Sequence, residues 1–174
     1  MTTKFEYVDD LFVGSNGLFA DTWMAATFTP SVPHAITSVK LLLWRVGTPA
    51  SVQVSIRATD GGLPSSAPTG ADLCSGVTNG DTLTTDTAGE WREITFPIPA
   101  ALKADRSYAI VVRAPSGSDP LNVIWWRRSN TGYAGGGRWD SLDAGVTWPI
   151  GQSADMGFED WGAPQQGGMF AFFP

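Results

Sequence analysis

Apolar and polar side chains alternate along several short stretches of this chain, and most stretches end at a turn rich in glycine or proline. The clearest stretch places Val52, Val54, Ile56 and Ala58 between polar neighbours, and it stops at the Asp-Gly-Gly-Leu-Pro segment over 60–64. Alternation with a period of two puts every second side chain on the same face of a β-strand. The stretch is therefore predicted to be a half-buried strand that ends in a turn.

The composition supports a fold made mostly of strands and turns. The chain has 20 Gly and 12 Pro in 174 residues but only 3 Lys and 4 Glu, which are residues that usually coat helix surfaces. Further strands are expected over 23–30, 36–46, 73–78, 83–85, 91–98, 108–114, 121–128 and 154–161, with a hairpin over 133–148. This order of elements predicts an all-β fold, an antiparallel two-sheet jelly-roll sandwich in a single domain.

Three segments are expected along the chain. They are an irregular N-terminal lead-in over 1–21, the jelly-roll β-sandwich over 22–162 and an apolar C-terminal docking tail over 163–174. The segments 27–39 and 94–108 both have a strand, a proline-containing corner and a second strand, which suits a jelly roll built from two Greek keys.

Charge and composition exclude several classes of protein. The net charge of −6 and the isoelectric point near 4.5 disfavour nucleic acid as a partner, because nucleic-acid binders need a surface of Lys and Arg. No apolar run approaches the roughly 20 residues that span a bilayer, so no membrane partner is expected. A single cysteine, Cys74, excludes an internal disulfide framework. The first ten residues contain no apolar leader, so synthesis in the host cytoplasm without a secretion signal is expected.

Catalysis and metal binding find little support in the residue types. The only histidine, His34, lies in a proline-flanked corner and is expected to be exposed, which leaves no Ser–His–Asp site. A glycosidase needs two positioned carboxylates, and most of the aspartates stand beside turn residues. We expect no catalytic residue, no cofactor and no metal. Structural calcium is the alternative for four aspartates in candidate loops, whose better interpretation is turn formation: Asp60, Asp81, Asp86 and Asp119.

One local motif has a stated mechanism. Ser141, Asp143, Gly145, Thr147 and Trp148 fit the spacing S-x-D-x-G-x-T-W, which resembles the Asp-box of sialidases and of related glycan-processing or glycan-binding proteins. The resemblance implies a tight hairpin turn in which the carboxylate accepts backbone N–H bonds, the glycine takes a positive φ and the aromatic ring packs beneath. There is one copy, and the arginine triad and the tyrosine nucleophile of a sialidase have no match, so the resemblance implies the turn and not the enzyme.

A wider likeness covers roughly residues 22–162. It resembles the jelly-roll modules of phage virion proteins and the carbohydrate-binding-type sandwiches of bacterial surface proteins. The segments that carry it are 22–30, 36–47, 54–64, 91–96, 102–117, 141–148 and 154–162. The likeness implies a capsid decoration protein, a tail-fibre or adhesive domain, or a lectin.

The 8 tryptophans exceed the usual share. Aromatic rings give a large contact area at small entropic cost, and glycan-binding sandwiches use them as flat platforms. Because strand side chains alternate, Trp125 and Trp126 are expected on opposite faces. The alternative for any single tryptophan is packing between the sheets or under the Asp-box hairpin. The candidate glycan platform comprises Trp125, Trp126, Arg128, Tyr133 and Trp139.

Both ends of the chain carry apolar aromatic residues. An apolar segment free in water favours aggregation, so these residues are expected to dock on their own sandwich or on an adjacent subunit. The candidate partner interface comprises Phe5, Tyr7, Phe12, Phe19, Met169, Phe170, Phe172 and Phe173.

An outward-facing module without a secretion signal or a disulfide framework suits a particle that is assembled inside a cell. The sequence therefore predicts a non-enzymatic virion structural protein at the particle surface, most simply a phage capsid decoration protein. It would form a homo-oligomer and contact the major capsid protein or other virion proteins. The alternative is a carbohydrate-binding or adhesive module that uses exposed Trp and Tyr.

Overall fold

The computed structural model describes residues 1–64, 66–130, 132–152 and 154–165. These residues form strands joined by turns and two single 3-10 turns, η1 (Asp60–Gly62) and η2 (Gly80–Thr82). The strands are β1 (Thr3–Val8), β2 (Phe12–Leu18), β3 (Trp23–Phe28), β4 (His34–Val46), β5 (Ser51–Thr59), β6 (Pro68–Asn79), β7 (Glu90–Leu102), β8 (Tyr108–Arg113), β9 (Val123–Ser129), β10 (Arg138–Ser141), β11 (Ile150–Gln152), β12 (Asp155–Met156) and β13 (Phe158–Pro164).

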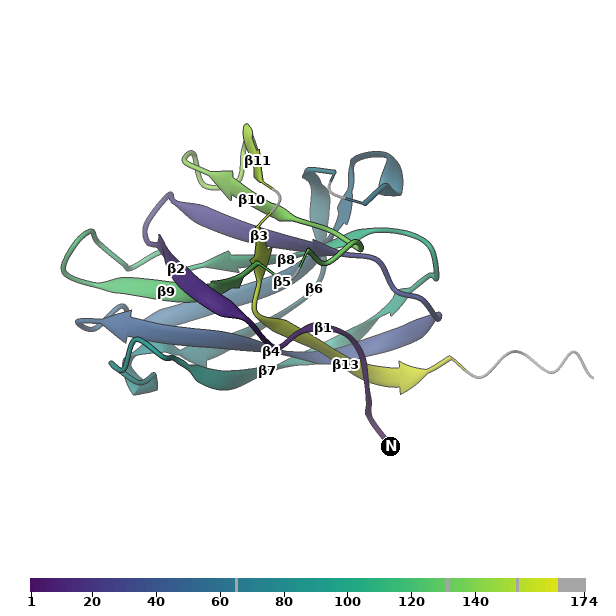
Figure 1. Cartoon of the computed structure of the whole chain (residues 1–174), viewed down its shortest axis with the longest axis horizontal. Coiled ribbons are helices and arrows are strands. Elements are labelled where there is room, and N and C mark those ends of the chain that lie inside the picture. The colour runs from purple at the N-terminus through teal and green to yellow at the C-terminus, as the bar shows by residue number, and fades with distance from the viewer. Residues whose placement is uncertain (65, 131, 153, 166–174) are drawn as a thin grey trace, which may run out of the picture.

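The strands form two antiparallel sheets, so the all-β sandwich expected from the sequence is confirmed. Figure 1 shows the two layers, with β10 and β11 at the top of the view and β4 and β7 at the bottom. The six-stranded sheet has the order β11-β10-β3-β8-β5-β6. The jelly-roll connectivity of the sandwich stays a prediction. In the part of the chain that the structure describes, no helix is long and apolar enough to cross a membrane.

The seven-stranded sheet is organised on β4. One edge of β4 pairs with β7 over residues 34–43, and the other edge pairs first with β13 over 34–41 and then with β9 over 43–46. Two strands thus lie end to end along a single edge of β4. The outer strand β1 pairs with β13, and β2 pairs with β9.

The core lies between the sheets and follows the alternation that the sequence shows. Val52, Val54 and Ile56 of β5 are fully buried. The largest fully buried side chains include Trp126, Phe28 and Phe158, from β9, β3 and β13. Each strand of a sandwich buries one face against the other sheet, which leaves the opposite face for other contacts.

Three sequence expectations differ from the structure, and one lies outside the residues that it describes. The lead-in over 1–21 is not irregular, because β1 and β2 are paired strands of the seven-stranded sheet. Residues 83–85 form no strand, and the turn expected at 79–81 is the 3-10 turn η2. The strand expected from Leu73 begins at Pro68. The tail residues 166–174, which include Met169, Phe170, Phe172 and Phe173, lie outside the described residues.

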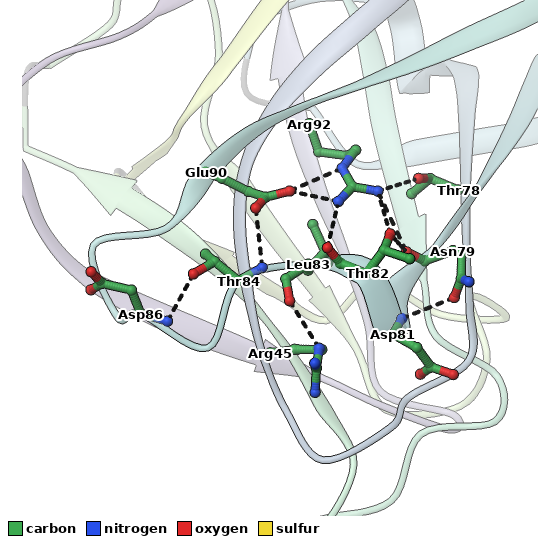
Figure 2. A network of polar contacts seen from close by, with 10 residues as sticks. All are labelled: Arg45, Thr78, Asn79, Asp81, Thr82, Leu83, Thr84, Asp86, Glu90 and Arg92. Carbon is green, nitrogen blue, oxygen red and sulfur yellow. Dashed lines mark hydrogen bonds and ion pairs between the residues drawn. The ribbon is translucent and has the colours of Figure 1, made fainter.

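The segment that connects β6 to β7 joins the two sheets, and one arginine holds it in place. Figure 2 shows the Arg92 guanidinium donating to the Glu90 carboxylate at 2.6 Å and to the hydroxyl of Thr82 at 2.8 Å. The same group donates to the Thr78 hydroxyl at 3.1 Å, and Glu90 accepts from the backbone N–H of Thr84. Arg92 therefore stabilises this connection, and its hydrogen-bond donors are used within the chain.

Candidate functional site

The outward side of the six-stranded sheet carries an apolar cluster that has no second sheet above it. Ala25 of β3 and two residues of β8, Ala109 and Val111, point away from the core but are fully buried. Trp23, Trp139 and Trp148 are half-buried and pack against these three small residues. We call the surface formed by the three tryptophans the tryptophan face.

Small residues beneath the indoles explain why they cover the sheet. Trp139 of β10 pairs with Ala25 on one side and with Gly151 of β11 on the other. A Cβ added at Gly151 would lie 2.9 Å from the Trp139 indole, so the ring lies across the position where another residue would carry a side chain. Any larger residue at position 151 would have to displace the indole.

The loop between β10 and β11 holds the residues of the S-x-D-x-G-x-T-W spacing in a closed turn. Asp143 accepts from the Thr147 backbone N–H at 2.9 Å and from the Thr147 hydroxyl at 2.6 Å. The Ser141 hydroxyl donates to Asp143 at 2.7 Å and accepts from the Gly145 N–H at 2.8 Å. These hydrogen bonds, first of all the one from the Thr147 hydroxyl, lower the pKa of Asp143 to about 2.

Gly145 fixes this loop against the tryptophan face. It has a φ of +77°, which is unfavourable for residues with a Cβ. A Cβ added there would lie 2.5 Å from the Trp23 ring and 3.5 Å from the Trp148 ring. The loop therefore lies directly on the edge of the face, and its tip exposes Leu142 and Val146 to solvent.

Two arginines lie over the Trp23 ring and border the tryptophan face there. The guanidinium of Arg113 lies 4.8 Å from the centre of the Trp23 ring, and that of Arg57 lies 5.8 Å away. Asp72 accepts from the Arg57 Nε at 2.7 Å, from the Arg113 Nη2 at 2.5 Å and from the Ser55 hydroxyl at 2.9 Å. Burial raises the pKa of Asp72, but these three hydrogen bonds outweigh it and hold the pKa below its ordinary value.

A surface hollow adjoins this charged group. It has a volume of about 390 Å³ and lies between β6 and β7, where Asp72, Cys74 and Ile98 line it. Asp72 therefore belongs both to the border of the tryptophan face and to the hollow, so a ligand longer than one ring could extend from the indoles along the edge of the sheet.

The five residues expected to form one glycan platform do not lie together. Trp125 and Trp126 do face opposite ways, but Trp126 is buried in the core and its Nε1 donates to the Gly157 carbonyl at 2.8 Å, so it is not available to a ligand. Trp125 lies on the outer face of the other sheet, stacked on Trp44 with ring centres 5.2 Å apart. Only Trp139 belongs to the tryptophan face.

The other two platform residues are also placed elsewhere. Tyr133 packs against the core, and its hydroxyl donates to Glu6 at 3.1 Å. Arg128 is half-buried beside β2, where a Cβ added at Gly14 would lie 3.0 Å from its Nε. The prediction groups residues that are close in the sequence, whereas a sheet brings together residues from neighbouring strands.

The structure also corrects the expectation of an exposed His34. Both His34 and Asp160 have fully buried side chains, and the His34 Nε2 lies 2.8 Å from the Asp160 Oδ2. The other ring nitrogen, Nδ1, lies 3.0 Å from the Val32 carbonyl oxygen, and the Phe5 ring stacks on the imidazole with centres 3.8 Å apart. Burial lowers the pKa of His34, but the hydrogen bond and the charge of Asp160 outweigh it and raise the pKa.

The aromatic residues of the lead-in mostly pack within the chain. Besides Phe5, Phe12 meets the Trp91 ring edge-on at 6.1 Å, and Phe19 is half-buried beside a short bridge to Thr22. Tyr7 is 49% exposed, and the Lys4 ammonium lies over its ring. The described part of the predicted partner interface thus leaves Tyr7 as its most exposed member.

The candidate calcium ligands are dispersed. Asp81 accepts from the Ala50 backbone N–H at 2.8 Å, and Asp86 accepts from the Ala88 N–H at 2.9 Å, so both stabilise local turns. Asp60 begins η1, and Asp119 stands before Pro120. Among the described residues, no three His, Cys, Asp or Glu side chains gather in a group that could hold a metal ion.

Comparison of the chain with protein-family models and with curated proteins finds no match.

Proposed function

We propose that this chain is a non-enzymatic recognition module of a virion surface, which binds a glycan through the tryptophan face. The observation that carries the proposal is the arrangement of Trp23, Trp139 and Trp148 on the outward side of a sheet, beside the group formed by Arg57, Arg113 and Asp72. A sugar presents apolar C–H faces and polar hydroxyls. Indoles supply contact area for the first, and arginine and carboxylate groups supply hydrogen bonds for the second.

Rigidity favours this use of the face. The indoles rest on a floor of fully buried small residues, and the loop between β10 and β11 is held by its own hydrogen bonds. A preformed surface loses little conformational entropy when a ligand binds. Weak binding by each module is sufficient on a particle, because many copies that engage one glycan-covered surface multiply the apparent affinity.

A glycan array with matched tryptophan variants tests the proposal. Trp139→Ala should abolish binding of the glycans that the wild-type chain retains. Trp44→Ala removes an indole from the outer face of the other sheet and should leave binding intact. Absence of wild-type binding at millimolar sugar, or equal losses in both variants, would overturn the proposal.

A second candidate is a capsid decoration protein that acts through protein contacts. The observation that favours it is a pair of exposed apolar residues that line the hollow between β6 and β7: Leu73 at 46% and Ile98 at 78% exposure. Apolar residues gathered in this way are typical of protein contact surfaces. Native mass spectrometry of particles assembled with Ile98→Asp should then show reduced occupancy, and unchanged occupancy would exclude this hollow as the contact.

A further inference from the structure

The border of the tryptophan face carries more positive than negative charge. Arg57 and Arg113 share a single carboxylate, Asp72, so the three groups carry a net charge of +1 in a chain whose net charge is −6. Resting on the proposed function, we infer that the sugar bound at this face carries a carboxylate, as in a uronic or sialic acid, and that Arg57 receives it.

Arg57 and Arg113 are held differently, and the difference selects Arg57. Arg113 uses one terminal nitrogen, Nη2, for both Asp72 and Ser55. Arg57 is held through its Nε alone, and no described residue accepts a hydrogen bond from either of its terminal nitrogens. The Asp72 contact orients the Arg57 guanidinium and leaves its outer pair of N–H groups open.

A guanidinium with two open parallel N–H donors can bind a carboxylate in a bidentate way, with one hydrogen bond to each oxygen. Arg57 is only 15% exposed as a side chain, so little rotational freedom remains to be lost when the ligand binds. The Trp23 ring lies 5.8 Å from the same guanidinium, so a sugar ring resting against the indoles can place its carboxylate at Arg57.

The carboxylates near the face do not occupy the open N–H groups of Arg57. Asp72 already accepts hydrogen bonds from three side chains. Asp143, in the loop between β10 and β11, accepts from Thr147 and Ser141 within its own turn. Both acids are therefore engaged inside the chain, and the open hydrogen-bonding groups at the Arg57 end are donors.

Isothermal titration with paired ligands tests the inference. The ligands are an oligogalacturonate, its carboxyl-reduced neutral counterpart and sialyllactose with its asialo counterpart. The wild-type chain should bind one of the acidic ligands about tenfold more tightly than its neutral counterpart, and the preference should shrink as salt is added. The two pairs distinguish a uronate from a sialate.

Variants assign the preference to Arg57. Arg57→Gln should weaken binding of the acidic ligand about tenfold more than binding of the neutral one, so that the preference disappears. Arg57→Lys, which keeps the charge but loses the paired donors, should retain only part of the preference. Arg106→Gln removes an exposed arginine outside this border as the matched control and should behave as the wild type. Equal wild-type affinity for acidic and neutral ligands would overturn the inference while the proposed function stands. Absence of binding to every glycan would instead overturn the proposed function.

Discussion

The buried pair of His34 and Asp160 yields the sharpest prediction, because the chain has one histidine and its titration can be followed alone. Both ring nitrogens face acceptors: Nε2 lies 2.8 Å from the Asp160 carboxylate and Nδ1 lies 3.0 Å from the Val32 carbonyl. Only the protonated imidazole can donate to both acceptors. Removal of one proton leaves a ring nitrogen lone pair facing either the Asp160 carboxylate or the Val32 carbonyl in a fully buried site.

The sign of the pH effect follows from the direction of the shift. The folded-state pKa of His34 is raised above its ordinary value of 6.5. The stabilisation is then fully present below pH 6.5 and is lost as the pH rises through the raised folded-state pKa. Asp160, whose pKa burial also raises, acts in the same direction from its ordinary value of 3.8 upward. Between pH 6.5 and the folded-state pKa, the folded chain binds one more proton than the unfolded chain, so the free energy of unfolding falls by at most about 1.4 kcal/mol per pH unit.

Asp160→Asn tests this account, because it removes the negative charge and keeps the size of the side chain. At pH 6 the variant should lose about 1–3 kcal/mol of stability, less than a typical broken buried ion pair, because His34 can become neutral. The difference from the wild type should shrink by pH 8. Urea unfolding between pH 5.5 and pH 9 measures the slopes, and NMR of the single imidazole gives its pKa. Asp143→Asn is the control, since a group with a pKa of about 2 does not titrate in this range. An imidazole pKa at or below 6.5, or a stability difference that does not change with pH, would refute the reasoning.

Three further changes have defined outcomes. Gly145→Ala should destabilise the chain by about 1–3 kcal/mol in urea unfolding, because an added Cβ would meet the Trp23 ring at a positive φ; unchanged stability would mean that the loop does not rest on the indole. Trp126→Phe should cost about 3 kcal/mol by calorimetry, since it removes the shorter of the two hydrogen bonds to the Gly157 carbonyl and opens a cavity, and a loss below about 1 kcal/mol would argue against that packing. Arg92→Leu should speed proteolytic cleavage between β6 and β7 and should change the global stability less than the cleavage rate. An unaltered cleavage rate would mean that Arg92 does not stabilise that segment.

The central strands could be predicted because their alternation is local. The alternation of Val52, Val54 and Ile56 with polar residues is sufficient to predict β5, and all three side chains are buried in the structure. The lead-in could not be predicted in the same way. In β2 the glycines Gly14 and Gly17 interrupt the alternation, and the strand is defined by pairing with β9, more than a hundred positions later. A proline-flanked histidine gives no local sign of Asp160, its buried partner, which comes from β13.

The candidate site shows the same limit. The sequence identifies Trp139 as a candidate aromatic contact, and the spacing around Asp143 indicates a turn. The assembly of the face required the order of strands β10, β3, β8 and β5, which brings Trp23 next to Arg57 and which period-two alternation does not encode. Arg57 lies on the polar side of the clearest strand, so its direction toward the outer face could be predicted from the alternation, but its neighbours could not.

The pairing of β1 with β13 determines when the chain can finish folding. Lys4 reaches Glu159 at 3.3 Å, across a separation of 155 positions, so the first strand has no partner until the last strand has been made. At roughly 5–20 residues per second, the ribosome needs roughly 8–30 s to supply that partner. During this interval the Asp160 partner of His34, the residue that the Phe5 ring covers, is also missing, and β1 presents an unpaired strand edge. Completion of the sandwich thus cannot precede the synthesis of β13, and chains that still lack this strand are most open to association with one another.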